Sequence, residues 1–167
     1  MAEGTVVFSR RNGTISVLDA TGTPLEYEVA YEDGELSVDI PEESLIDIMD
    51  RGQFTNPPQV RKDQDQPITG SFTYKLRDAG NATDATVFDL PGNQGVFGST
   101  WVPTNGANAE VALYTLRLTL SSLGGTKSGT IDFPFCTFRQ SIDDSSGVYV
   151  GTINFISRAV RPTVTLA

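Results

Sequence analysis

The stretch from Glu110 to Ser157 constrains the fold most, because three successive runs in it alternate apolar and polar residues with a period of two. In the first run Tyr114, Leu116 and Leu118 share one side and alternate with polar residues. Such alternation, rich in β-branched and aromatic residues, is typical of half-buried strands. Glycine-containing turns, LGGTKSG and DDSSG, separate the runs. The stretch therefore predicts a meander of three antiparallel strands.

The second run of the meander, TIDFPFCTFRQS, changes phase at Pro134. Phe133 and Phe135 share one side, whereas the next apolar positions are Cys136 and Phe138. Proline cannot donate to a strand ladder, so the change of phase predicts a β-bulge or an edge position. We expect Phe133, Phe135 and Cys136 to be largely buried. The thiol of Cys136 should be inert, because the chain has no histidine to activate it.

Shorter β-like runs precede the meander. They form two expected hairpins, residues 5–8 with 14–18 around Asn12-Gly13, and 25–31 with 35–40 around 32–34. A strand is expected at 68–77, where Phe72 and Tyr74 alternate with polar residues, and another at 95–106 around Trp101, ending in the turn 103–106.

Two segments carry helix signals. Residues 41–52 begin with Pro41, end with Gly52 and contain an apolar stripe at Leu45, Ile48 and Met49. Residues 81–90 carry a second helix signal, which Pro91-Gly92 ends. Together these elements predict one mainly-β domain over residues 1–167. We expect a β-sandwich or barrel of antiparallel strands with one or two short helices packed on its side.

Residues 52–67 contain no core pattern, and we interpret them as a loop or an arm. A surface loop and an arm that reaches a neighbouring subunit both fit this composition. The candidate inter-subunit residues are Asn56, Pro57, Pro58, Arg61, Lys62, Asp63 and Asp65.

The composition excludes most catalytic chemistry. With no histidine and one cysteine, the chain has no histidine-based triad and no cysteine or histidine zinc site. Its carboxylate pairs fall in expected turns, loops and a helix start, so a carboxylate-based hydrolase is the weakest of the alternatives. Residues 63–65 and 143–147 carry enough oxygens to suggest calcium but lack the spacing of an EF-hand. We predict no enzymatic activity, no cofactor and no membrane partner.

Four stretches resemble the tail tube protein of long-tailed bacteriophages. They are GTPLEYEVAYEDGELSVD, IMDRGQFTNPPQVRKDQDQPITGSFTYKL, GSTWVPTNG followed by VALYTLRLTL, and GTIDFPFCTFRQSIDDSSGVYVGTINFIS. Together they span nearly the whole chain. The resemblance is one of pattern, without a catalytic signature.

The resemblance implies a structural protein of the virion tail, assembled in the host cytoplasm. It implies hexameric rings that stack into a hollow tube, through which phage DNA is ejected without specific binding. Other tail proteins are the implied partners, namely the tape measure, terminator and distal tail proteins. Two alternatives stay open: another tail protein, such as a terminator or the inner tube of a contractile tail, and a carbohydrate- or protein-binding β-sandwich module.

Three acidic residues are candidates to face the lumen of such a tube. Glu26 and Glu28 alternate with apolar residues, and Asp132 alternates with Phe133. A sheet with one buried face places such carboxylates on its solvated face. Alternation does not distinguish the lumen from the outer surface. An acidic lumen would repel DNA phosphates, and the net charge of −9 agrees with this expectation.

Overall fold

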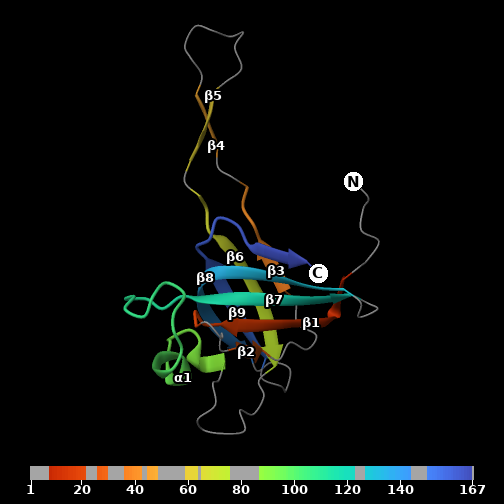
Figure 1. Cartoon of the computed structure of the whole chain (residues 1–167), viewed down its shortest axis with the longest axis vertical. Helices are drawn as coiled ribbons and strands as arrows, with labels where there is room; N and C mark the ends of the chain where they lie inside the picture. The colour runs from red at the N-terminus through yellow and green to blue at the C-terminus, as the bar shows by residue number, and fades with distance from the viewer. Residues whose placement is uncertain are drawn as a thin grey trace.

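The computed structural model describes residues 8–21, 26–29, 36–42, 45–48, 59–63, 65–75, 87–122, 127–143 and 150–166. Most of them form one antiparallel sheet that curls into a half-barrel (Figure 1). Its strand order is β2-β1-β7-β8-β9-β6-β3, and β10 pairs with β8. The strands are β1 Phe8–Leu18, β2 Glu26–Val29, β3 Leu36–Asp39, β6 Ile68–Lys75, β7 Tyr114–Ser122, β8 Ser128–Asp143, β9 Val150–Ser157 and β10 Thr163–Leu166. The mainly-β prediction is confirmed.

The predicted meander is present as β7-β8-β9, and β8 bends where the sequence changes phase. Its first part pairs with β7 on one side and β10 on the other, and its second part pairs with β9. Leu116 pairs with Phe133 and Tyr114 with Cys136, so three steps along β8 match two along β7. The predicted bulge is therefore confirmed.

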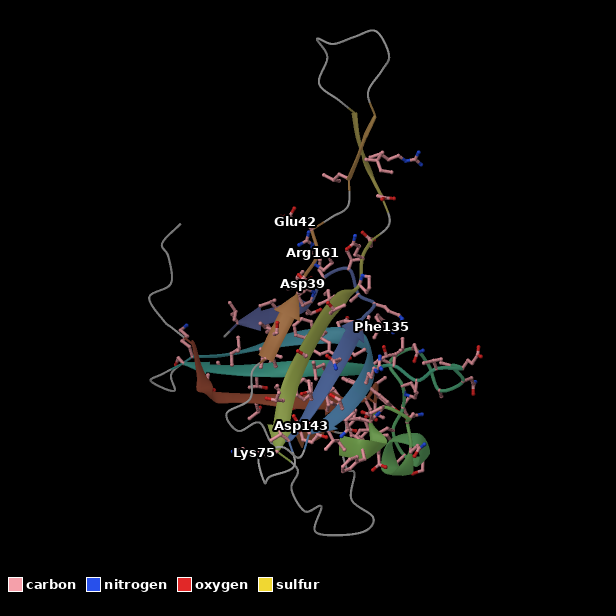
Figure 2. All side chains as sticks on the ribbon, turned by 180° about the vertical axis from the view of Figure 1, so that it is seen from behind. Asp39, Glu42, Lys75, Phe135, Asp143 and Arg161 are labelled. Carbon is pink, nitrogen blue, oxygen red and sulfur yellow. The ribbon has the colours of Figure 1, made fainter. Side chains whose placement is uncertain are left out.

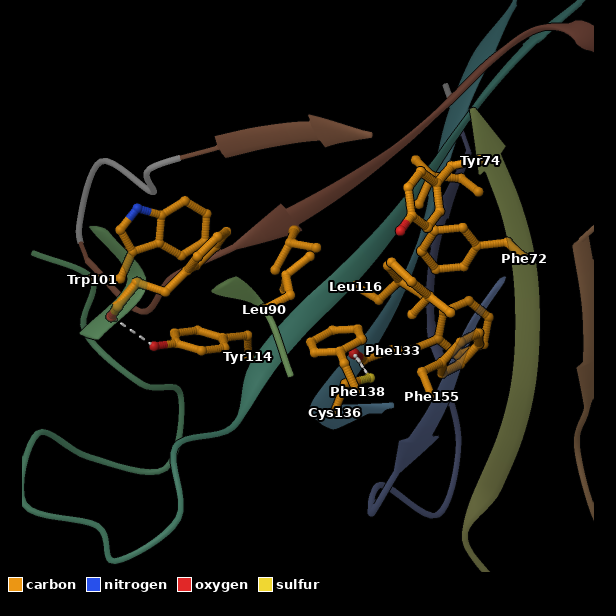
Figure 3. Packing of buried hydrophobic residues seen from close by; sticks show 14 of the residues in the cluster. Phe72, Tyr74, Leu90, Trp101, Tyr114, Leu116, Phe133, Cys136, Phe138 and Phe155 are labelled. Atoms are coloured by element: carbon orange, nitrogen blue, oxygen red, sulfur yellow. Dashed lines mark hydrogen bonds between the residues drawn. The ribbon is translucent and has the colours of Figure 1, made fainter. Parts of the chain in front are cut away.

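The core lies on the concave side of this sheet (Figure 3). Phe133 and Cys136 are buried as expected, but Phe135 is 39% exposed, so its predicted burial is wrong. The reason is the bulge: the extra residue drops out of the alternation, and Cys136 takes the inward position. The core contains Ile15, Val17, Ile68, Phe72, Tyr74, Leu90, Phe97, Trp101, Tyr114, Leu116, Phe133, Cys136, Phe138, Ile153 and Phe155.

Neither of the expected N-terminal hairpins is found in the described part of the chain, and residues 5–7, 25 and 30–35 of those predictions lie outside it. Strand β1 runs through Asn12-Gly13, and a register shift against β7 between Ser9 and Thr14 absorbs the extra residues. Strand β2 pairs with β1, and β3 pairs with β6, at opposite ends of the sheet order. A turn signal reports only on a few neighbouring residues. Which strands pair is decided instead by the burial of the apolar faces of long alternating strands.

The expected helix at 41–52 is also wrong, because β4 Leu45–Ile48 occupies it and pairs with β5 Gln59–Lys62. Two isoleucines in LIDI favour a strand, and pairing with β5 overrides an apolar stripe of only three residues. Residues 43–44 and 49–52 lie outside the described residues. Of the expected helix at 81–90, the structure describes the short 3-10 helix η1, Val87–Asp89, and Leu90.

The strand expected at 95–106 is instead the helix α1, Gly95–Ser99, followed by an irregular segment. The aromatic ring of Phe97 lies 4.5 Å from that of Trp101, which lies 5.7 Å from that of Tyr114. The Tyr114 hydroxyl donates to the Phe97 carbonyl at 3.0 Å and contacts Asn93 Oδ1. The cluster of Phe97, Trp101 and Tyr114 packs α1 against the sheet. The predicted turn at 103–106 is confirmed by a 3.1 Å hydrogen bond from Gly106 N–H to the Pro103 carbonyl.

Glycines face aromatic rings in two cross-strand pairs of β6 and β9. Gly70 pairs with Phe155, and Tyr74 pairs with Gly151. A Cβ added at Gly70 would lie 2.5 Å from Phe155 Cζ and 2.7 Å from the Ser37 carbonyl oxygen. Only glycine at position 70 therefore leaves room for the Phe155 ring and the Ser37 carbonyl.

Candidate assembly surfaces

Between β3 and β6, which pair with each other, the chain forms a second pair of strands outside the main sheet. Strand β3 pairs with β6, and the segment between them returns as β4 paired with β5 in a separate two-stranded sheet. Figure 1 shows this β4–β5 arm projecting beyond the main sheet. Leu45 and Ile46 on it are 56% and 45% exposed. Leu45 and Ile46 are consecutive in β4, so their side chains lie on opposite faces of the arm. A lone two-stranded hairpin is marginally stable in water, so contact with a neighbour would stabilise it.

The predicted inter-subunit residues divide between described and undescribed parts of this arm. Arg61 and Lys62 belong to β5, and Asp63 and Asp65 follow it on the way to β6. Arg61, Asp63 and Asp65 are exposed. The remaining candidates, Asn56, Pro57 and Pro58, lie outside the described residues. Contact with a neighbouring subunit stays a prediction.

Strands β3-β6-β9 and the second part of β8 form a section of sheet with two open edges. Strand β3 pairs only with β6 among the described strands. Beyond Cys136, β8 pairs with β9 and has no described strand on its other side. A groove of about 520 Å³ lies along this part of β8, lined by residues 137–141, Asn154 and Ile156. Open edges present unpaired N–H and C=O groups and so invite pairing with another chain.

The face of this section opposite the core is polar and rich in hydroxyl groups. It carries Ser37 and Asp39 on β3, Thr69, Ser71, Thr73 and Lys75 on β6, Val150, Thr152, Asn154 and Ile156 on β9, and Thr137, Arg139, Ser141 and Asp143 on β8. Its two acidic and two basic residues balance. Such a face is built for contact with water or with a polar surface.

The structure brings two of the three candidate lumen acids into one cross-strand row. Glu28 pairs with Ser16, Ser16 with Arg117, and Arg117 with Asp132. Arg117 donates from Nε and Nη2 to the two carboxylate oxygens of Asp132 at 2.7 and 2.8 Å. This bidentate pair offsets the charge of Asp132. The sequence pattern placed Asp132 on the solvated face but missed Arg117, because the register between strands was unknown.

Glu26 lies one row away from Glu28, paired with Leu18 in the same edge strand β2. The side chains of both glutamates lie outside what the structure describes. Their contribution to a channel wall stays a prediction.

The side chain of Cys136 is buried. Burial raises the pKa of Cys136 to about 12, and its thiol donates to the Phe133 carbonyl at 3.0 Å. Within the described residues no group of three or more histidine, cysteine, aspartate or glutamate side chains could hold a metal ion. Residues 64 and 144–147 of the two suggested calcium segments lie outside them. No helix in the described parts of the chain is long and apolar enough to cross a membrane.

No protein-family model and no curated protein sequence matches this chain. Solved structures do match its fold over essentially its whole length. A chain of the PVC sheath-tube complex of an extracellular contractile injection system aligns with a TM-score of 0.59 at 12% identity, covering 96% of this chain and 93% of that one. The anti-feeding prophage tube terminating cap aligns with 0.56 at 12%, covering 100% and 96%. The anti-feeding prophage baseplate, 6-fold symmetrised, aligns with 0.56 at 11%, covering 100% and 97%. The chain thus shares the fold of these proteins.

Proposed function

We propose that this chain is a structural subunit of a phage-tail-like particle. Its copies form hexameric rings, and the rings stack into a hollow tube through which DNA passes. The observation that carries the proposal is the full-length fold likeness to chains of a sheath-tube complex, a tube cap and a 6-fold baseplate. This agrees with the resemblance of the sequence to tail tube proteins. The role is structural and requires no catalysis.

The two open edges of the sheet section support ring formation. If β3 of one copy pairs with the open part of β8 in the next, each copy continues the sheet of its neighbour. Such a contact joins two different surfaces, so it repeats head to tail and closes into a ring when the rotation between copies fits. The backbone groups of both edges would then be paired, which favours the ring over the separate subunit.

The polar face of this section is a suitable channel wall. Its hydroxyl groups and balanced charges offer a passing polyanion no cationic surface to adhere to. Glu26 and Glu28 would add negative charge, whereas Asp132 would add little because Arg117 pairs with it. Together they would let DNA slide without specific binding.

The β4–β5 arm is proposed to join subunits. Its exposed Leu45 and Ile46 lie beyond the body of the sheet, where they can reach a neighbouring copy. The ends of the tube would bind other tail proteins.

A second candidate is a terminator or cap, which ends a tube rather than building it. The full-length likeness to the anti-feeding prophage cap favours this alternative at nearly the same TM-score. A tube protein polymerises into rods, whereas a cap forms single rings.

Electron microscopy of the purified protein tests the proposal. We expect rings or hollow rods with a central hole, and rods would favour a tube over a cap. Deletion of residues 57–65 should reduce rod length, whereas deletion of residues 144–147 serves as a control of similar kind. A protein that stays monomeric up to millimolar concentration, in the presence and absence of salt, would contradict the proposal.

A further inference from the structure

The two edges that the proposed ring would join run in the directions that a continuous antiparallel sheet requires. Strands β8, β9, β6 and β3 are each antiparallel to the next, so β3 runs opposite to β8. Figure 2 shows Asp39 at the end of the sheet section from which the arm rises, Phe135 toward the same end and Asp143 at the opposite end. Strand β3 of one copy can therefore pair with β8 of the next as a regular antiparallel neighbour.

The side-chain faces limit the register of this contact. One cross-strand row of the section ends in Phe138 and Val38 on the core face, and the next row ends in Thr137 and Asp39 on the polar face. A shift by one residue would turn polar side chains toward the core, so only shifts by an even number of residues keep both faces continuous. A shift is needed, because strands that close into a barrel are staggered.

The bulge of β8 decides the direction of the shift. At the bulge, Cys136 pairs with Tyr114 of β7 on one side and with Ser157 of β9 on the other. A neighbouring β3 displaced toward Cys136 would meet β7, which occupies this edge. The contact must therefore be displaced the other way, toward Asp143 at the end of β8.

We propose that the contact is displaced by two residues, which sets Asp39 of one copy opposite Arg139 of the next. Both side chains are exposed on the polar face, and they carry opposite charges. The same register sets Leu36 opposite Ile142, which is 51% exposed in the single subunit. A displacement by four residues would instead set Pro41 opposite Arg139 and separate the two charges. The inference rests on the proposed function and adds the residues that select the register between copies.

The apolar end of the contact fits a hollow beside β8. In the proposed register Ile40, which is 44% exposed, lies opposite Phe138 of the next copy. A hollow of about 290 Å³ adjoins Phe138 and is lined also by Leu90, Val111 and Ala112. Val111 is 58% exposed in the single subunit. Entry of Ile40 into the hollow would therefore cover an exposed apolar side chain from each copy.

Pairs of cysteines on the polar face test the register. Ser37→Cys is combined with Ser141→Cys, which the proposed register sets opposite it, or with Thr137→Cys or Asp143→Cys as controls. Within one copy two strands separate the paired positions, at least about 14 Å and too far for a disulfide, so a bond can form only between copies. We expect oxidation to give a ladder of linked copies with Ser141→Cys and little linking with either control, since Cys136 is buried. Equal linking with Thr137→Cys and Ser141→Cys, as an unshifted contact would give, would overturn the proposal.

An exchange of charges tests the ion pair without cysteines. Asp39→Arg and Arg139→Asp should each raise the concentration needed for assembly by roughly tenfold or more, because like charges would meet at every contact. A one-to-one mixture of the two variants should assemble near the wild-type concentration, since alternating copies then join opposite charges. Ser71→Asp, on the central strand β6, replaces Arg139→Asp in the control mixture and should not restore assembly of Asp39→Arg. Single variants that assemble like the wild type, or a mixture no better than either variant alone, would overturn the ion pair.

Electron microscopy of the same samples separates this inference from the proposed function. Rings or rods without linking, or with the strongest linking at Thr137→Cys or Asp143→Cys, would overturn the register and leave the proposed function intact. Wild-type protein without particles, together with no linking in any variant, overturns both. A ladder with Ser141→Cys but no rings or rods would support the register and contradict the proposed function.

Discussion

Substitution of Gly70 by alanine should destabilise the subunit more than any surface change of one methyl group. The new Cβ would lie 2.5 Å from Phe155 Cζ and 2.7 Å from the Ser37 carbonyl oxygen. The ring is buried, and the carbonyl belongs to the neighbouring strand, so neither can move without separating packed elements. Overpacking of this kind costs about 3 kcal/mol. The lower entropy of the unfolded alanine chain returns about 0.4–1 kcal/mol.

The net loss is therefore about 2 kcal/mol, which for a domain of this size lowers the unfolding temperature by about 4–8 °C. Calorimetry on dilute, non-assembled protein measures it. Thr69→Val at the adjacent exposed position is the control and should change stability by less than about 0.5 kcal/mol. Adding Phe155→Leu should recover part of the loss but not all, since the Ser37 contact remains. An unchanged unfolding temperature for Gly70→Ala would refute the packing argument.

Three further predictions concern Cys136, Tyr114 and the pair Glu26 and Glu28. Cys136 should react with thiol reagents only as fast as the protein unfolds, and rapid labelling would contradict its burial. Since the pKa of Cys136 is raised from 9.0 to about 12, its contribution to stability should be complete below pH 9 and fall as pH rises toward 12. Cys136→Ala should weaken this loss of stability at high pH. Tyr114→Phe should cost about 1–2 kcal/mol in chemical denaturation because the Phe97 carbonyl loses its donor, and no loss would show that the hydroxyl bond is dispensable. Replacing Glu26 and Glu28 with lysine should leave assembly intact but slow DNA ejection from particles, and normal ejection by tubes shown to contain the variant would place both residues outside the channel.

The parts of the fold that the sequence predicted are those in which a local pattern coincides with burial. The alternation of β7, β8 and β9 identified the meander, and the change of phase at Pro134 identified the bulge. The alternation in β6 placed Phe72 and Tyr74 in the core, where both are buried. These patterns work because a period of two is imposed by the pleat whenever one face of a strand is buried.

The parts that failed depend on which strand pairs with which. Asn12-Gly13 is a strong turn signal, but β1 continues through it because β7 offers a long partner. The apolar stripe at 45–49 fits a helix, yet pairing with β5 makes a strand. Phe135 was assigned inward because the position of the extra residue within a bulge cannot be read from the phase change alone. Of the candidate acids, only Asp132 is described with its partner, and that ion pair is set by register.

The features that a solitary subunit leaves unsatisfied all belong to one part of the molecule. Monomeric proteins cover or shorten their sheet edges and bury their apolar side chains. Here the edges of β3 and β8 that no described strand covers, the β4–β5 arm with its exposed Leu45 and Ile46, and the strained Phe135 at the bend of β8 occur together in a single section of the sheet. Each is unfavourable in the subunit alone, and head-to-tail contact with another copy would pair the edges and cover the exposed side chains, while the backbone conformation of Phe135 would stay as the bulge sets it. The same contact would join the polar faces of neighbouring sections into one surface. In the proposed assembly the interfaces carry the function, which requires compatible edges rather than a catalytic group.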